Sequence, residues 1–228
     1  MMDMAAVAGG GKKDAAAGVK ESGKSYLCGM NVIRRTMAVV ARLRHRAGFG
    51  VHSPWAFRLI RDVIGEELPY YAYDDLQREH PISDKRTLRF CRLYLRLSNF
   101  MQAAEAVDYA SPTPVYGLYI SAGCRKTRLL SADGTQKGAA EAASAVATAT
   151  LTRLSAAGPY ATVAASWTSS APAGAMLIVE NIDSSRDARR LWRQLIDDPA
   201  CTLTFDLYYC GIVYRDPKRH KQHFIVNF

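Results

Sequence analysis

Two aspartates stand where a chain of alternating strands and helices would place them beside a bound nucleoside. Asp108 lies near the end of the β-rich run EAVDYA, and Asp133 follows a second β-rich run 25 residues further along. In α/β folds the turn after the first strand approaches the ligand, and an acid at the tip of the second strand accepts hydrogen bonds from ribose hydroxyls. The spacing therefore predicts a site for an adenosyl group, with Asp133 as its ribose ligand.

Two further patterns resemble known sites, but their surroundings argue against them. Gly18 to Ser25 reads GVKESGKS, which matches a phosphate-binding loop, yet the preceding GGGKKDAAA cannot supply the buried strand that such a loop needs. His220 and His223 have the spacing of two metal ligands on a helix, but no third ligand is near in sequence. We therefore favour a basic tail and a basic turn, and we expect no bound metal.

The composition is that of a globular protein with one domain and a tail. The chain has 228 residues, of which 49% are hydrophobic and 22% charged, and these values exclude disordered, collagen-like and disulfide-stapled classes. The five cysteines are odd in number and form no C-x-x-C pair, which fits a reducing compartment. No apolar run has the length of a membrane span or a signal peptide, so we expect a cytoplasmic protein.

Positive charge is concentrated near the start of the chain. The formal net charge is +9, and the stretch from Met30 to Arg61 contains seven arginines and no acid. Such a stretch is either a solvated helix face or a surface that attracts anions without reading a sequence. Five of the arginines would form the contact in the second case: Arg34, Arg35, Arg42, Arg44 and Arg46.

The first half of the chain predicts helices behind a disordered tail. Residues 1–25 contain too few large apolar side chains to offset the entropy of ordering. A basic amphipathic helix is expected from about Met30, a second from Ser53 as N-cap to about 64, and a third over about 84–104. We therefore divide the chain into a tail (1–25), a helical N-terminal extension (26–104) and a core (105–228).

The core alternates β-rich and helical runs, which is typical of a parallel sheet with crossover helices. The fold class expected is α/β and Rossmann-like, mostly parallel, with an antiparallel C-terminal edge. The predicted strands are 105–110, 127–132, 160–165 and 176–180, the helices 114–122, 136–154 and 185–197, and the edge runs 202–209, 211–215 and 223–228.

Three separated segments give the chain a family resemblance. They are GVHSPWAF from Gly50, YYAYDD from Tyr70, and the closing LTFDLYYCGIVYRDPKRHKQHFIVNF. With them the chain resembles class I S-adenosylmethionine-dependent methyltransferases of a bacterial O-methyltransferase-like group. The resemblance spans roughly residues 30–228 and is strongest at its two ends.

The resemblance implies roles for particular residues. Asp108 matches the acid of the family's first motif, near the methionine end of the cofactor, and Asp133 matches the ribose acid. Ala110 and Pro114 fall where that motif has glycines. The implied cofactor contacts in these two loops are Asp108, Ala110, Ser111, Asp133 and Gly134. Glu180 and Asn181 fall where metal-dependent members carry an acidic or Asp-Asn pair, which makes them the candidate catalytic or acceptor contacts.

Two functions follow from the resemblance. One is methyl transfer from S-adenosylmethionine to a small hydroxylated acceptor. The other is a catalytically inactive descendant that serves as a binding or scaffold protein, with Trp55 and the basic helix as a contact surface. Pro112 and Pro114 remove backbone donors from the first turn, so we expect S-adenosylmethionine to bind weakly or not at all. No acid precedes the segment MLIVEN at the family's position, so a divalent metal is not expected.

Overall fold

In a computed structural model of the protein, residues 53–228 are described. The predicted tail 1–25, the phosphate-loop match at 18–25 and the helix predicted from Met30 lie outside the described residues. The same holds for the proposed anion contact through Arg34, Arg35, Arg42, Arg44 and Arg46.

Two of the helices before residue 104, α2 (Pro54–Leu59) and α4 (Lys85–Met101), begin where the sequence predicts them, whereas α3 (Tyr71–Glu79) was not predicted. Helix α2 begins after Ser53, whose Oγ accepts a hydrogen bond from Ala56 N at 3.4 Å, and it continues as the π-helix η2 (Ile60–Ile64). After α3, helix α4 begins after Asp84. The Asp84 carboxylate accepts a hydrogen bond from Thr87 N at 2.8 Å, which satisfies a backbone donor that the helix itself cannot pair.

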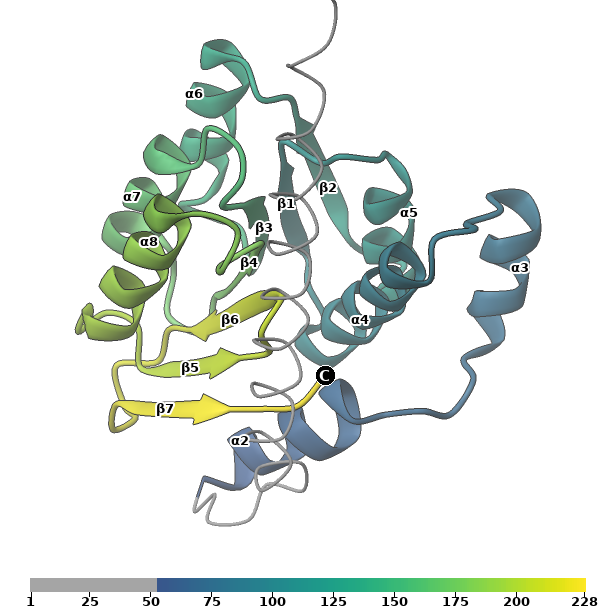
Figure 1. The fold of residues 1–228 in the computed structure, drawn as a ribbon, viewed down its shortest axis with the longest axis horizontal. Helices are drawn as coiled ribbons and strands as arrows, with labels where there is room; N and C mark the ends of the chain where they lie inside the picture. Colours follow the sequence, from purple (N-terminus) through teal and green to yellow (C-terminus); the bar gives the residue numbers. More distant parts are fainter. Residues whose placement is uncertain (1–52) are drawn as a thin grey trace, which may run out of the picture. The chain divides into compact units, whose positions relative to one another are not determined.

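A seven-stranded sheet forms the centre of the fold, with strand order β2-β1-β3-β4-β6-β5-β7 (Figure 1). Strands β1 to β4 run parallel, whereas β6 runs antiparallel to both β4 and β5. This arrangement confirms the predicted α/β fold class with an antiparallel edge. The strands are β1 (Glu105–Tyr109), β2 (Arg128–Ala132), β3 (Leu151–Ser155), β4 (Met176–Glu180), β5 (Leu203–Asp206), β6 (Cys210–Tyr214) and β7 (Gln222–Ile225).

Four helices connect the strands, and the third strand is not where the sequence predicted it. The helices are α5 (Val115–Gly123), α6 (Gln136–Ala145), α7 (Ala161–Ser170) and α8 (Arg186–Asp197). The predicted strand 160–165 is wrong, because this segment lies in α7 and buries Val163, Ala164 and Trp167 on one face. The predicted helix 136–154 is too long, because it ends at Ala145 and its last residues belong to β3. A full crossover helix therefore stands between β3 and β4.

The last strand also departs from the expected antiparallel edge. Strand β7 pairs in parallel with β5. Both edges of β6 are already hydrogen-bonded, one to β4 and the other to β5. The outer edge of β5 is the free edge at this end of the sheet, and β7 occupies it in the same direction as β5.

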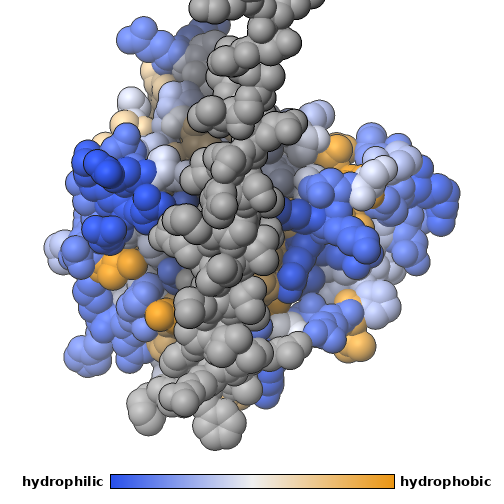
Figure 2. Space-filling model, viewed as in Figure 1, coloured by the Kyte–Doolittle hydropathy of each residue, from blue (hydrophilic) through white to orange (hydrophobic). Residues whose placement is uncertain are grey.

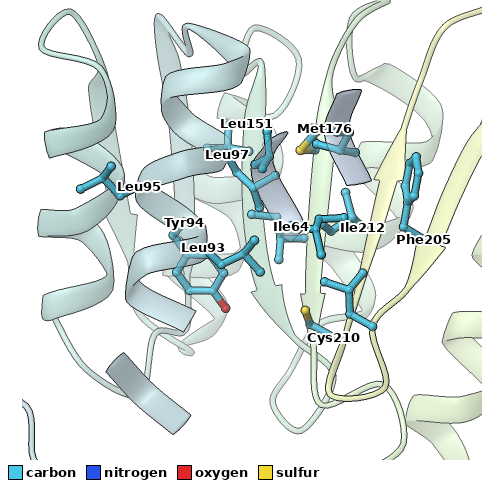
Figure 3. Close-up of a cluster of buried hydrophobic side chains, with 14 of the residues drawn as sticks. Ile64, Leu93, Tyr94, Leu95, Leu97, Leu151, Met176, Phe205, Cys210 and Ile212 are labelled. Atoms are coloured by element: carbon cyan, nitrogen blue, oxygen red, sulfur yellow. The ribbon is translucent and has the colours of Figure 1, made fainter. Parts of the chain in front are cut away.

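Two hydrophobic clusters hold the helices on opposite faces of the sheet. Helices α6, α7 and α8 cover one face, while α4 and α5 cover the other (Figure 1). Figure 3 shows the second cluster, where Leu93 and Leu97 of α4 lie near Leu151, Met176 and Ile212 of the sheet. Residues from η2 join the same cluster, so the helices before residue 104 share their core with the sheet.

The surface of the described residues is largely hydrophilic. Figure 2 shows mostly hydrophilic groups beside the grey atoms, with hydrophobic residues as separate spots. Within residues 53–228, no helix is long and apolar enough to cross a membrane.

Candidate functional site

The predicted site residues lie at the carboxyl ends of the parallel strands. The chain passes from β1 outward to β2 and then crosses back to β3 on the other side of β1, so the connections diverge between β1 and β3. Ligands of open α/β sheets bind outside the carboxyl ends of the strands at such a switch point. Asp108 is in β1, Asp133 directly follows β2, and Glu180 ends β4. The sequence therefore placed these acids at the correct edge of the sheet.

A buried arginine that the sequence analysis did not identify joins two of these acids. Arg153, in the middle of β3, donates from Nη1 to Asp108 Oδ1 at 3.0 Å and from Nε to Glu180 Oε1 at 2.8 Å. Its Nη1 also donates to the Tyr109 carbonyl at 3.0 Å. Arg153 is 0% exposed, Asp108 1% and Glu180 3%. One guanidinium thus bridges β1 and β4 inside the protein.

Helices α4 and α5 close this network from above the sheet. The Tyr94 hydroxyl of α4 donates to Glu180 Oε1, and the guanidinium carbon of Arg153 lies 5.1 Å from the centre of the Tyr116 ring of α5. Burial, together with the charge of Glu180, raises the pKa of Tyr94 far above its ordinary value, so its hydroxyl keeps its proton. Tyr94, Glu180, Arg153 and Asp108 are therefore linked by a continuous series of hydrogen bonds.

The opposite charges in the network partly offset the free-energy cost of burying each charged group. Burial raises the pKa of Asp108, although the charge of Arg153 and its hydrogen bond to Asp108 partly oppose that rise. Burial alone would lower the pKa of Arg153, but the carboxylates of Glu180 and Asp108 raise it on balance. Buried charges are tolerated when they are paired and hydrogen-bonded in this way. Within the described residues, Arg153 Nη2 is the buried nitrogen of this group without a hydrogen bond.

Ala110 has the backbone conformation of a glycine. Its φ is +50°, in the left-handed region that residues with a Cβ seldom adopt. Pro114 takes the N-cap position of α5 with φ of −63°, and Ser111 Oγ donates to the Thr113 carbonyl at 2.9 Å.

Asp133 is turned toward the start of α6. Its Oδ1 accepts hydrogen bonds from Thr135 N at 3.1 Å and from Thr135 Oγ1 at 2.5 Å. These bonds lower the pKa of the Asp133 carboxyl, so it is ionised at neutral pH. The same Oδ1 stands so close to Gly138 that a Cβ at that position would collide with it. The exposed carboxylate thus makes its hydrogen bonds to the first turn of the helix.

The turn after β3 lies against both predicted cofactor loops. A Cβ placed on Gly134 would be 3.5 Å from Pro159 Cγ and 3.6 Å from the Ala110 Cβ, so these three residues are neighbours. The Pro159 carbonyl accepts a hydrogen bond from the Tyr109 hydroxyl at 2.9 Å, which fixes the turn over the end of β1. A cavity of about 360 Å³ remains beside the turn, and Tyr109, Gly134, Thr135, Pro159 and Tyr160 are among its lining residues.

The remaining predicted residues have local partners. Asn181 has φ of +59°, and its Nδ2 donates to Ser155 Oγ at 3.0 Å. Ser155 is the last residue of β3, the strand that precedes β4 in the chain. His223 lies in β7, and its Nδ1 is 2.8 Å from Thr204 Oγ1, so the helical spacing considered for His220 and His223 does not apply. Within residues 53–228, no three His, Cys, Asp or Glu side chains are grouped so as to hold a metal ion.

The sequence offered little that would have revealed Arg153. The run LTRLS carries a charge at its centre and follows an alanine-rich stretch, so it continues a helical pattern better than it begins a strand. Its counter-charges come from strands 45 residues earlier and 27 residues later.

Three solved structures similar to this chain are methyltransferases. A protein of Staphylococcus aureus described as a caffeoyl-CoA O-methyltransferase is 13% identical, covers 64% of this chain and 93% of its own, and has a TM-score of 0.49. A methyltransferase of Geobacter sulfurreducens is 16% identical over 69% of this chain and 95% of its own, with a TM-score of 0.49. The MycE methyltransferase of the mycinamycin biosynthetic pathway, solved with Mg and SAH, is 10% identical over 67% of this chain and 50% of its own, with a TM-score of 0.45.

The likeness is one of fold. No family model matches the chain, and no curated protein matches it. These comparisons assign neither an activity nor a site residue to this chain.

Proposed function

We propose that the chain is a methyltransferase-like protein whose own side chains take the place of the cofactor, and that it serves as a non-catalytic binding or scaffold protein. The observation that carries the proposal is the buried Arg153, which holds Asp108 and Glu180 together. Asp108 is the acid that the family resemblance places near the methionine end of the cofactor. In this chain its charge is already neutralised, and its side chain is 1% exposed.

The adenosyl end of the expected cofactor position supports the same proposal. The cofactor would need the space between the turns that follow β1 and β2. Here Pro159 lies beside the Gly134 turn and Gly158 lies beside Ala110, while Asp133 makes its hydrogen bonds to Thr135. The prolines expected to interfere were Pro112 and Pro114, and a third proline, Pro159 from the turn after β3, lies beside the Gly134 turn as well.

Calorimetric titration of the full chain with S-adenosylmethionine and S-adenosylhomocysteine tests the proposal. We expect no binding, or a dissociation constant weaker than about 1 mM, for both compounds. Asp133→Ala is the matched control, and it should leave the result unchanged. Micromolar binding that Asp133→Ala abolishes would overturn the proposal, because it would require a working ribose site.

One observation favours the second candidate function, methyl transfer to a small hydroxylated acceptor. The cavity of about 360 Å³ lies at the carboxyl ends of β1 and β2, and its volume is within the range of small-molecule sites. Tyr109 and Tyr160 would then border the ligand. Micromolar cofactor binding in the titration above would favour this function.

A further inference from the structure

A second cavity lies on the opposite side of α4 from Tyr94, and one of its walls carries several positively charged side chains. Its volume is about 570 Å³, and it is lined by the loop that follows η2, by α3, by one face of α4 and by the last two residues. The end of the chain, marked C, lies beside α4 (Figure 1), where the guanidinium carbon of Arg89 is 4.5 Å from the centre of the Phe228 ring. This cavity shares no lining residue with the one at Pro159.

The basic wall of this cavity is one face of α4. Residues spaced by three or four positions lie on the same side of a helix. Four cationic residues of α4 follow that spacing and line the cavity: Lys85, Arg89, Arg92 and Arg96.

Arg96 is a buried cation that lacks a counter-charge. It is 6% exposed, and it donates from Nε to the Val63 carbonyl at 2.6 Å and from Nη1 to the Tyr73 hydroxyl at 3.1 Å. Burial raises the pKa of Tyr73 despite the opposing charge of Arg96, so this phenol is a neutral acceptor. Among the described residues Arg96 forms no ion pair, whereas the other buried arginine, Arg153, has two. A buried cation with only neutral partners retains a strong attraction for an anion.

The two neighbouring arginines are oriented by aromatic rings. The guanidinium of Arg92 stands 5.0 Å from the centre of the Tyr73 ring, and that of Arg89 stands over Phe228. Neither forms an ion pair with a carboxylate of the described residues. Stacking on a ring fixes the guanidinium plane and leaves its N–H edge free to bind the oxygens of a phosphate or carboxylate.

The opposite wall limits what kind of anion can enter. Glu66, Glu67 and Asp74 line it, and Glu66 Oε1 accepts a hydrogen bond from Leu68 N at 2.7 Å. A polyanion such as a nucleic acid or an anionic membrane needs a broad surface of one sign, which these three carboxylates interrupt. A small ligand with one doubly charged end satisfies the arginines and avoids the acids.

We propose that the cavity between α3 and α4 binds a small molecule through a phosphate group held by Arg89, Arg92 and Arg96. Phosphate is favoured over a single carboxylate because three guanidinium groups and Lys85 offer more charge than one carboxylate can neutralise. The proposal does not depend on the state of the Arg153 network, since the two sites use different residues.

Calorimetric titration of the full chain with inorganic phosphate at constant ionic strength tests this site. The wild-type chain should bind phosphate and unfold at a higher temperature in its presence. The exposed pair Arg89→Gln and Arg92→Gln should together weaken binding at least about tenfold, because two charge-assisted contacts are lost. Arg193→Gln, which removes one positive charge from the exposed side of α8, is the control for a general loss of charge and should leave the affinity within about twofold.

Three results would overturn the proposal. They are the absence of phosphate binding to the wild-type chain, an equal loss of affinity in Arg193→Gln, and tighter binding of citrate than of phosphate, which would indicate a carboxylate ligand. Arg96→Met gives an independent check on the buried charge. Phosphate should raise the melting temperature of this variant by less than half the wild-type shift, and an unchanged shift would also contradict the proposal.

Discussion

Arg153 and Asp108 are paired by register on neighbouring parallel strands, and Arg153 Nη1 lies 3.0 Å from Asp108 Oδ1 with both side chains buried. The same guanidinium reaches Glu180 at the end of β4. The edge of the sheet where a cofactor would be expected is thus held together by the protein's own charges.

Loss of the central cation should be costly. Arg153→Met leaves Asp108 and Glu180 buried without a counter-charge, so we expect about 3–5 kcal/mol lower stability at neutral pH in urea unfolding. Adding Asp108→Asn and Glu180→Gln to the same variant removes both orphaned charges and should recover more than half of that loss. A loss below about 1 kcal/mol in the single variant would show that the network contributes little.

Ala110 should tolerate replacement by glycine. Its φ of +50° costs an alanine more than a glycine, which offsets the greater entropy that glycine loses on folding. Ala110→Gly should therefore leave the free energy of unfolding unchanged or raise it by up to about 1 kcal/mol. Ala139→Gly, in the regular helix α6, is the control and should lower stability by about 1 kcal/mol. Equal losses in the two variants would argue against the left-handed backbone at Ala110.

Gly211 in β6 is required by the packing of Trp192 from α8. A Cβ at Gly211 would lie 2.7 Å from Cε3 of Trp192 and closer still to two other ring atoms. Gly211→Ala should overpack this contact and lower stability by about 1–3 kcal/mol in urea unfolding, with a change in the near-UV circular dichroism of the tryptophans. At Gly158 the nearest atom is 3.7 Å from such a Cβ, so Gly158→Ala is the control and should change stability little.

The protein should lose stability in mildly alkaline solution. Burial raises the pKa of the Cys91 and Cys201 thiols to about 12, from the ordinary 9.0. The folded state therefore keeps these protons between pH 9.0 and about 12, while the unfolded chain releases them, so raising the pH favours unfolding. Each thiol contributes at most about 1.4 kcal/mol per pH unit in that window.

Urea unfolding from about pH 8 to pH 10.5 in the presence of a reductant measures this slope. The double variant Cys91→Ala and Cys201→Ala should unfold with a shallower pH dependence than the wild-type chain. A stability that stays constant across this range would contradict the raised thiol pKa values.

Local signals in the sequence determined much of the fold. Ser53 and Asp84 predicted helix starts correctly, because an N-cap side chain acts on backbone donors only two or three residues away. The run MLIVE predicted β4 with its observed bounds, because a strand buried on both faces is apolar throughout. The placement of Asp108 and Asp133 at one edge followed from the parallel connectivity alone.

Only the tertiary structure decided what occupies that edge. The strand β3 was not predicted, because its central residue, Arg153, is charged. A charged side chain argues against a buried strand unless its ion-pair partners are known. Here the partners, Asp108 and Glu180, come from β1 and β4, which lie on either side of β3 in the folded sheet. The position of Pro159 against Gly134 depends likewise on a turn that follows the misread strand. Long-range charge pairing cannot be read from local sequence patterns, so the sequence placed the acids at this edge of the sheet, while the fold determined their partners.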